Sequence, residues 1–388
     1  MLADTDAGSI ITAAQSGAEW GYRLLLLQVV LIPILYVVQE VTVRLGIVTG
    51  RGHGQLIRER FGAPWAWVSV ATLILSCMGA LISELSGIAG VGQLLGIPAW
   101  ISMTIVIAGL TLMAYTGSYL TVERIALAIG IFELVFLAVA WQAHPEPGAL
   151  LKGALSMPLG DPKYLYLAAA NIGAVIMPWM VFYQQSAVVE KKLTVGDLPA
   201  ARIDTAVGAV ITQLIMAAVL IATAATLGRA GRNESLETVQ QIAEAITPFL
   251  GKRIGTIMFS LGMIGAALVA TIVVTLTAAR TLGELMGFKH SLEYHPRDAP
   301  WFYGVYTVAL SLGGLLIASG TNLVKISVGV QVMNALLLPI VLGFLFLLAR
   351  RALPDPYRLK GSYALITAIV IGTTAIFGVY AGLLGIFS

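Results

Sequence analysis

Charged residues are scarce in this sequence. Of its 388 residues only 11% are Asp, Glu, Lys or Arg, whereas 58% are hydrophobic. A soluble domain has about a quarter of its residues charged and needs them at its surface. A chain of this length with so little charge cannot cover itself with polar groups, so we expect lipid to be its solvent. The net charge of +3 is too small to indicate a nucleic-acid partner.

Cysteine and histidine are also rare. The single cysteine, Cys77, excludes an internal disulfide and a thiolate metal cluster. The histidines lie in or beside polar segments, so we expect no buried metal site built from them; they are His53, His144, His290 and His295. We find no nucleotide-binding loop and no nucleophile beside a base. We therefore expect neither an enzyme nor a bound cofactor.

Long apolar runs recur along the chain, and a bilayer needs about 20 such residues per helix. We place spans at 22–46, 65–94, 98–117, 119–142, 166–189, 200–228, 254–286, 301–319, 323–350 and 362–386, with a shorter fragment at 8–17. The polar segments 52–61 and 235–250 have helical spacing and predict short amphipathic helices. The first residues lack the basic and apolar regions of a signal peptide, so we expect none.

Lys and Arg are unevenly distributed between the loops. The loop after span 22–46, and every second loop from there, holds most of the 23 Lys and Arg residues. Loops rich in these residues remain in the cytoplasm. We therefore expect a multi-pass protein of the cell membrane, surrounded by lipid, with a cytoplasmic N-terminus. The sequence leaves the oligomeric state open and is compatible with a monomer.

Two places combine polar residues with helix breakers. One is segment 4–9, directly before an apolar run, and the other is segment 171–180, in the middle of span 166–189. Pro178 lacks an N–H and clashes with the preceding turn, so it breaks or kinks the second segment. Asp6 is an acid at membrane depth, which is costly and marks a functional candidate. Paired breaks predict an ion site near the middle of the membrane, where unwound carbonyls coordinate a cation.

The two breaks also suggest an internal repeat. Five spans end near residue 142, and the sixth contains the second break. We therefore expect an all-α membrane protein with two inverted five-helix repeats, residues 1–142 and 143–352, in which helices 1 and 6 are broken. Residues 353–388 would add an eleventh helix.

One block carries a specific resemblance. Residues 44–50 read Arg-Leu-Gly-Ile-Val-Thr-Gly and are followed by Leu-Ile-Arg-Glu-Arg-Phe at 56–61. This block resembles the segment after the second helix in the Nramp family of divalent metal transporters, and the resemblance extends over most of the chain. It implies a LeuT-like fold and transport of divalent metal ions by alternating access. Only five residues precede Asp6, so we expect the half-helix that precedes this acid in the family to be absent here.

The resemblance also implies a ligand set. The family's metal site has Asp-Pro-Gly-Asn in helix 1 and Met-Pro-His in helix 6. The matching residues here read Asp-Ala-Gly-Ser at 6–9 and Met-Pro-Trp at 177–179. The implied ligands are the Asp6 carboxylate, the Ser9 hydroxyl, the Ala174 carbonyl, the Met177 thioether and, from helix 10, the Gln331 amide.

Several groups that the family uses for the co-transported proton are missing. Trp179 and Gln184 stand where helix 6 has two histidines, and Leu81 stands where helix 3 has an Asp, three residues before Glu84. These losses resemble the divergent Nramp-related magnesium transporters, which are not proton-coupled. Ser9 in place of Asn leaves room for a water, which suits Mg²⁺, whereas a thioether such as Met177 favours softer ions. We expect import of Mg²⁺ and Mn²⁺ without coupled protons.

Two alternatives stay open. One is a proton-coupled Mn²⁺ and Fe²⁺ transporter of the Nramp type, and the other is a transporter of an organic solute such as an amino acid on the same fold. Asp6 argues against the second, because it would repel the solute's carboxylate at the break. Three further acids lie deep in spans, Glu40, Glu84 and Glu133. For Glu84, the sequence leaves a structural and a functional role equally open.

Overall fold

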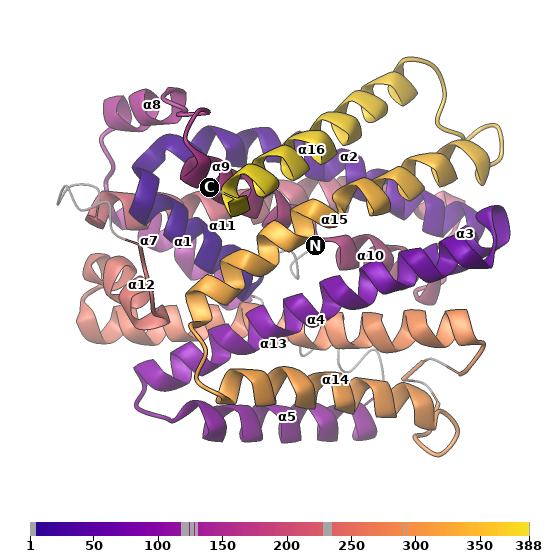
Figure 1. Ribbon diagram of the computed structural model, residues 1–388, viewed down its shortest axis with the longest axis horizontal. Helices are drawn as coiled ribbons and strands as arrows, with labels where there is room; N and C mark the ends of the chain where they lie inside the picture. Colours follow the sequence, from indigo (N-terminus) through magenta and orange to yellow (C-terminus); the bar gives the residue numbers. More distant parts are fainter. Residues whose placement is uncertain are drawn as a thin grey trace.

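The computed structural model is built from helices packed lengthwise (Figure 1). It describes residues 5–117, 124, 128, 131–227, 235–289, 291–292 and 294–387, and every regular element within these ranges is a helix. Nine segments among these residues are long and apolar enough to cross a membrane. The prediction of an all-α membrane protein is therefore confirmed.

The helices follow the predicted spans. The long ones are α1 Ala7–Trp20, α2 Leu25–Thr49, α4 Ala63–Leu94, α5 Ala99–Thr116, α9 Pro162–Val175, α10 Pro178–Glu190, α11 Leu198–Leu227, α13 Lys252–Met286, α14 Pro300–Ala318, α15 Leu323–Arg351 and α16 Gly361–Phe387. The short ones are α3 His53–Phe61, α7 Val135–Gln142, α8 Pro147–Leu155 and α12 Val239–Ile246. The first part of the predicted span 119–142 lies largely outside the described residues. The division into two repeats, residues 1–142 and 143–352, is not tested by the helix bounds and stays a prediction.

The amphipathic segment 235–250 is helical over a shorter range than we predicted. The Thr238 hydroxyl accepts a hydrogen bond from the Gln241 N–H at 3.2 Å, and the Gln241 side chain accepts one from the Thr238 N–H at 3.2 Å. This reciprocal capping box starts α12 after Thr238. Ser235 therefore lies outside the helix, where its hydroxyl accepts a hydrogen bond from Gln15 of α1 at 2.6 Å.

Two short helices mark opposite ends of the bundle (Figure 1). α3 packs against α4, α10 and α13 at one end, and α12 packs against α4, α11 and α13 at the other. We call these the α3 end and the α12 end. Between them α1 begins near the centre of the molecule, where it packs against α9, α15 and α4. A helix that starts inside the bundle brings its unpaired N–H groups to membrane depth.

The break between α9 and α10 follows from Pro178. Proline has no N–H, so the Ala174 carbonyl four residues earlier is left without a helical partner. Ile176 (φ −112°, ψ 75°) and Met177 (φ −78°, ψ 129°) connect the two helices in non-helical conformations. Gly173 lets α9 press on α15, because a Cβ there would lie 1.9 Å from the Gln331 carbonyl oxygen. The predicted break in the sixth helix is thus confirmed, and it sits against α15.

A buried ion cluster fixes α16 to the bundle. Glu40 of α2 is 2% exposed, and it accepts hydrogen bonds from Arg44 at 2.6 Å, from Arg202 of α11 at 2.8 Å and from the Tyr363 hydroxyl of α16 at 2.9 Å. A buried carboxylate costs several kcal/mol unless cations and donors surround it. Glu40 therefore has a structural role, because three helices depend on it for one junction.

We expect Glu40→Gln to destabilise the protein by about 3–5 kcal/mol, since the change leaves the buried Arg44 guanidinium without its carboxylate and removes the partner of the more exposed Arg202. The measurement is thermal unfolding in detergent, followed by tryptophan fluorescence. Asp355→Asn is the matched control, because Asp355 pairs with Lys360 but its side chain is 71% exposed, and it should leave the midpoint unchanged. Equal midpoints for Glu40→Gln and the unaltered protein would contradict the role of this cluster.

Candidate metal site

The first described helix begins at an acid. Asp6 is the N-cap of α1, and its Oδ1 accepts the Ser9 N–H at 2.6 Å. A carboxylate at this position stabilises the helix through the unpaired N–H groups and the helix dipole. Asp6 is fully buried, yet its Oδ2 has no hydrogen-bond partner among the described residues. One buried carboxylate oxygen is therefore open to a cation.

The carbonyl released by Pro178 faces the same turn of α1. The Ser9 hydroxyl donates to the Ala174 oxygen at 2.9 Å. Mg²⁺ binds oxygens at about 2.0–2.1 Å in an octahedron, so neighbouring ligand oxygens are then about 2.9 Å apart. The Ser9 and Ala174 oxygens have this spacing. A serine hydroxyl can turn its proton away and offer a lone pair, so both oxygens could bind one ion.

Gln331 reaches the first turn of α1 from α15. Its amide is fully buried, and its Nε2 has no partner within the described ranges. A Cβ on Gly8 would lie 2.2 Å from this nitrogen and 2.4 Å from the Ser83 hydroxyl of α4. Only glycine leaves room here for both side chains. Met177 lies three residues after Ala174 in the link to α10, where it is 1% exposed.

A second carboxylate, that of Glu84, reaches this turn. The sequence alone had left its role open. Glu84 of α4 accepts the Ala7 N–H at 2.9 Å through Oε2, and its Oε1 has no partner in the described structure. Gly87, one turn further along α4, permits the close approach, because a Cβ there would lie 2.4 Å from the Ala7 Cβ. Asp6 and Glu84 thus both bond the first turn of α1. Two negative charges match the charge of one divalent cation.

These two acids stand apart from other metal-ligating side chains. Over the described ranges, no group of three or more His, Cys, Asp or Glu side chains is placed to hold a metal ion. A cation at Asp6 and Glu84 would therefore complete its coordination with neutral oxygens, the Met177 sulfur or water. Hard cations such as Mg²⁺ and Mn²⁺ accept oxygen ligands of this kind.

Neutral side chains occupy the positions of the missing proton carriers. Trp179 and Leu81 are fully buried, and Gln184 is 9% exposed. His53 is buried as well, although it follows a polar loop, because α3 packs against α10. Its Nδ1–H donates to Gln185 at 2.9 Å, and burial lowers the pKa of His53 to about 4. His53 is therefore neutral at physiological pH.

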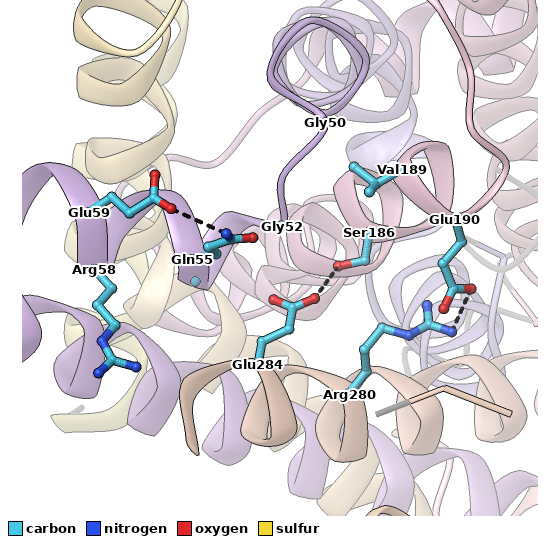
Figure 2. Close-up of a pocket in the computed structure, with 11 residues that line it drawn as sticks. Gly50, Gly52, Gln55, Arg58, Glu59, Ser186, Val189, Glu190, Arg280 and Glu284 are labelled. Carbon is cyan, nitrogen blue, oxygen red and sulfur yellow. Dashed lines mark hydrogen bonds and ion pairs between the residues drawn. The ribbon is translucent and has the colours of Figure 1, made fainter. Parts of the chain in front are cut away.

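A cavity opens at the α3 end (Figure 2). Its volume is about 640 Å³, and it lies between the loop before α3, the end of α10 and the end of α13. Figure 2 shows Arg280 of α13 turned toward Glu190 of α10, at 2.7 Å, and Glu284 turned toward Ser186, at 3.5 Å. These contacts link the two helices across one wall of the cavity.

A second cavity, of about 680 Å³, lies at the α12 end between α1, α9, α15 and α16. Gln15 closes one side, because its side chain bonds the Ser235 hydroxyl at 2.6 Å and the Leu236 N–H at 3.0 Å. Neither cavity is lined by Asp6, Glu84 or another candidate ligand among the described residues. The candidate ligands are themselves buried, because none of their side chains is more than 1% exposed.

The fold has solved counterparts. The crystal structure of the Eremococcus coleocola manganese transporter, in complex with an aromatic bis-isothiourea substituted compound, superposes with a TM-score of 0.78 at 18% identity, covering 100% of this chain and 86% of that one. The crystal structure of MhsT in complex with L-phenylalanine superposes with a TM-score of 0.58 at 14% identity, covering 98% and 97%. These likenesses confirm the predicted LeuT-like fold with its broken helices.

Related sequences support one family. The divalent metal cation transporter MntH of Aeromonas hydrophila is 28% identical over 389 residues, which cover 95% of this chain and 91% of that protein. MntH of Chromohalobacter salexigens is 28% identical over 299 residues, which cover 71% and 66%. The family described as natural resistance-associated macrophage protein-like matches residues 1–384. This chain therefore belongs to the Nramp family.

Proposed function

We propose that this protein imports Mg²⁺ and Mn²⁺ across the cell membrane by alternating access, without coupled protons, through a site formed by Asp6, Ser9, Ala174, Met177 and Gln331. One observation carries the proposal. Asp6 and Glu84 are buried at the start of α1, and each keeps one oxygen without a partner among the described residues. Ionised carboxylates in such surroundings are stable only with a compensating cation. The related proteins named as divalent metal and manganese transporters support the same class of substrate.

The ligand set favours small divalent ions with an oxygen-rich shell. Asp6, Glu84, Ser9, Ala174 and Gln331 all offer oxygen, and the Ser9 and Ala174 oxygens lie within 2.9 Å of each other, close enough for one ion to bind both. Met177 supplies the one soft atom, which Mn²⁺ tolerates better than Mg²⁺ does. Ser9 is shorter than the asparagine of the family motif, so a water can remain on the ion. This combination supports transport of both ions.

Alternating access fits a buried site with one cavity at the α3 end and another at the α12 end. With the basic loops in the cytoplasm, the N-terminus and the α3 end face inward and the α12 end faces outward. Outward opening would separate Gln15 from Ser235, and inward opening would separate α10 from α13 at Arg280 and Glu190. The contacts between Gln15 and Ser235 and between Arg280 and Glu190 are polar, and polar contacts can exchange for water when an end opens.

Transport without protons is supported by the neutral side chains at the two positions where helix 6 of the family has histidines. A proton relay needs titratable groups in sequence, and histidine is best suited near neutral pH. Trp179 and Gln184 cannot titrate there, and burial keeps His53 neutral because its pKa is about 4. Membrane potential can supply the driving force, since a divalent ion gains about 4.6 kcal/mol per 100 mV, roughly three orders of magnitude in concentration.

The alternative is a proton-coupled Mn²⁺ and Fe²⁺ transporter of the Nramp type. Glu84 favours it, because a second acid beside Asp6 could carry a proton in exchange for the ion. An organic-solute transporter has less support. Asp6 and Glu84 would both repel the carboxylate of an amino acid at the break, where such a solute is normally held.

Asp6→Asn should lower Mn²⁺ uptake into liposomes by roughly 100-fold or more, because it removes one of two charges that compensate the ion. Asparagine caps helices as well as aspartate does, so the variant should fold normally. Asp161→Asn is the matched control, since Asp161 caps α9 through the Lys163 N–H at 2.9 Å in an exposed position, and its uptake should not change. Normal uptake by a folded Asp6→Asn protein would refute the site.

Mn²⁺ entry should leave the internal pH of liposomes unchanged. A dye inside the vesicles reports protons while radioactive Mn²⁺ reports the ion, and a potassium diffusion potential provides the driving force. We expect uptake to rise with the potential and to be nearly constant between pH 6 and 8. Acidification that accompanies Mn²⁺ entry, and that disappears with Asp6→Asn, would instead establish the proton-coupled alternative.

A further inference from the structure

The two ends of the Gln331 amide have different surroundings. Its Oε1 accepts a hydrogen bond from Asn334 Nδ2, one turn further along α15, at 2.9 Å. Its Nε2 lies against Gly8 at the start of α1 and has no hydrogen-bond partner in the part of the chain that is described. The donor end of the amide therefore faces the turn that holds Asp6.

The chain of hydrogen bonds extends from Gln331 to α4. The Ser76 hydroxyl donates to Asn334 Oδ1 at 2.8 Å, and all three side chains are fully buried. Every donor in this chain points the same way, from Ser76 through Asn334 to Gln331 and on to α1. This polarity suits an empty site, because an N–H end lies beside carboxylates. The same orientation is unfavourable for a bound cation, because a cation binds the oxygen of the amide and not its N–H groups.

Each member of the chain can donate and accept. The two amides have one donor end and one acceptor end each, and the serine hydroxyl serves as either. If both amides turn over together, Gln331 Nε2 donates to Asn334 Oδ1 and Asn334 Nδ2 donates to Ser76 Oγ. The chain then contains two hydrogen bonds, as before, and Gln331 Oε1 faces α1. The reversal exchanges no proton and keeps both hydrogen bonds. The Ser76 hydroxyl proton then turns away from Asn334, and the Gln331 oxygen that faces α1 is left for the ion.

We propose that Asn334 and Ser76 are positioning residues for the metal site, and that ion binding reverses their hydrogen-bond chain so that Gln331 presents its oxygen to the ion. This inference rests on the proposed function, since it takes Gln331 to be a ligand. Asn334 holds the amide in one of two orientations and prevents intermediate ones. In the ion-bound state the Gln331 oxygen points toward the ion. In the ion-free state the Gln331 N–H points toward the turn that holds Asp6.

A purely structural role for Asn334 would be to join α4 to α15. The two roles differ in how they depend on Gln331. A positioning residue acts on the ion only through the Gln331 amide, so its contribution to metal binding disappears when that amide is removed. A helix junction affects binding through the backbone and keeps its effect in either background. A double-mutant cycle separates the two.

The experiment measures Mn²⁺ binding to the purified full-length protein by isothermal titration calorimetry. Gln331→Ala should weaken binding roughly 10-fold and Asn334→Ala roughly 3- to 10-fold, the range for one buried hydrogen bond. The double variant should bind like Gln331→Ala alone. The inference is overturned if Asn334→Ala leaves the affinity for Mn²⁺ unchanged. It is also overturned if Asn334→Ala lowers the affinity by the same factor in the Gln331→Ala protein as in the unaltered protein.

Ser76→Ala provides a milder variant should Asn334→Ala fail to fold. We expect a roughly 2- to 3-fold loss of affinity that also vanishes in the Gln331→Ala background. Ser86→Ala is its control, because Ser86 is buried in α4 and its hydroxyl donates to the Ile82 carbonyl of its own helix at 2.6 Å. The affinity of this variant for Mn²⁺ should not change. If the losses from Ser76→Ala and Gln331→Ala are additive, the role of the hydrogen-bond chain is refuted. Asp6→Asn tests the metal site separately: if it still abolishes binding, the site stands although the chain does not.

Discussion

The proposed function depends on two buried carboxylates, those of Asp6 and Glu84, that both accept hydrogen bonds from the first turn of α1. Burying an ionised carboxylate costs several kcal/mol unless something compensates it. Glu40 is just as buried as Asp6 and Glu84, and it has two arginines and a tyrosine hydroxyl around it. No such basic partner reaches Asp6 or Glu84 among the described residues. Glu40 thus has permanent cations beside it, whereas the proposed function gives Asp6 and Glu84 a cation that arrives and leaves.

Local sequence features bring the elements of the site together. Pro178 frees the Ala174 carbonyl by removing one N–H, and the helix break leaves that oxygen facing Ser9. Gly8, Gly87 and Gly173 lie where α1, α4, α9 and α15 touch, and a Cβ at any of them would collide with a neighbour. The same close packing that builds the site also closes it. Polar contacts at the two ends, such as that of Gln15 with Ser235, can exchange for water when an end opens.

Most of the fold could be predicted because apolar length and helix breakers are local signals. The spans, the break at Pro178 and the amphipathic helix α3 follow from them. The partner of Glu84 could not be predicted, because its bond to Ala7 crosses 77 positions and depends on which face of α4 meets α1. The burial of His53 was missed for the same reason, since it follows a polar loop and is covered by residues distant in the sequence, such as Phe182 and Gln185 of α10. Helix periodicity gives the faces of each helix, and it does not give their partners.

The most direct test is the position of the bound ion. Crystals of the full-length protein grown with Mn²⁺ give an anomalous signal from the metal alone. The account predicts one strong peak at the first turn of α1, within coordination distance of the Asp6 carboxylate and of the Ser9 and Ala174 oxygens, with the Gln331 oxygen turned toward it. A peak in the cavity at the α3 end, near Glu190 and Glu284, with none beside Asp6, would contradict it.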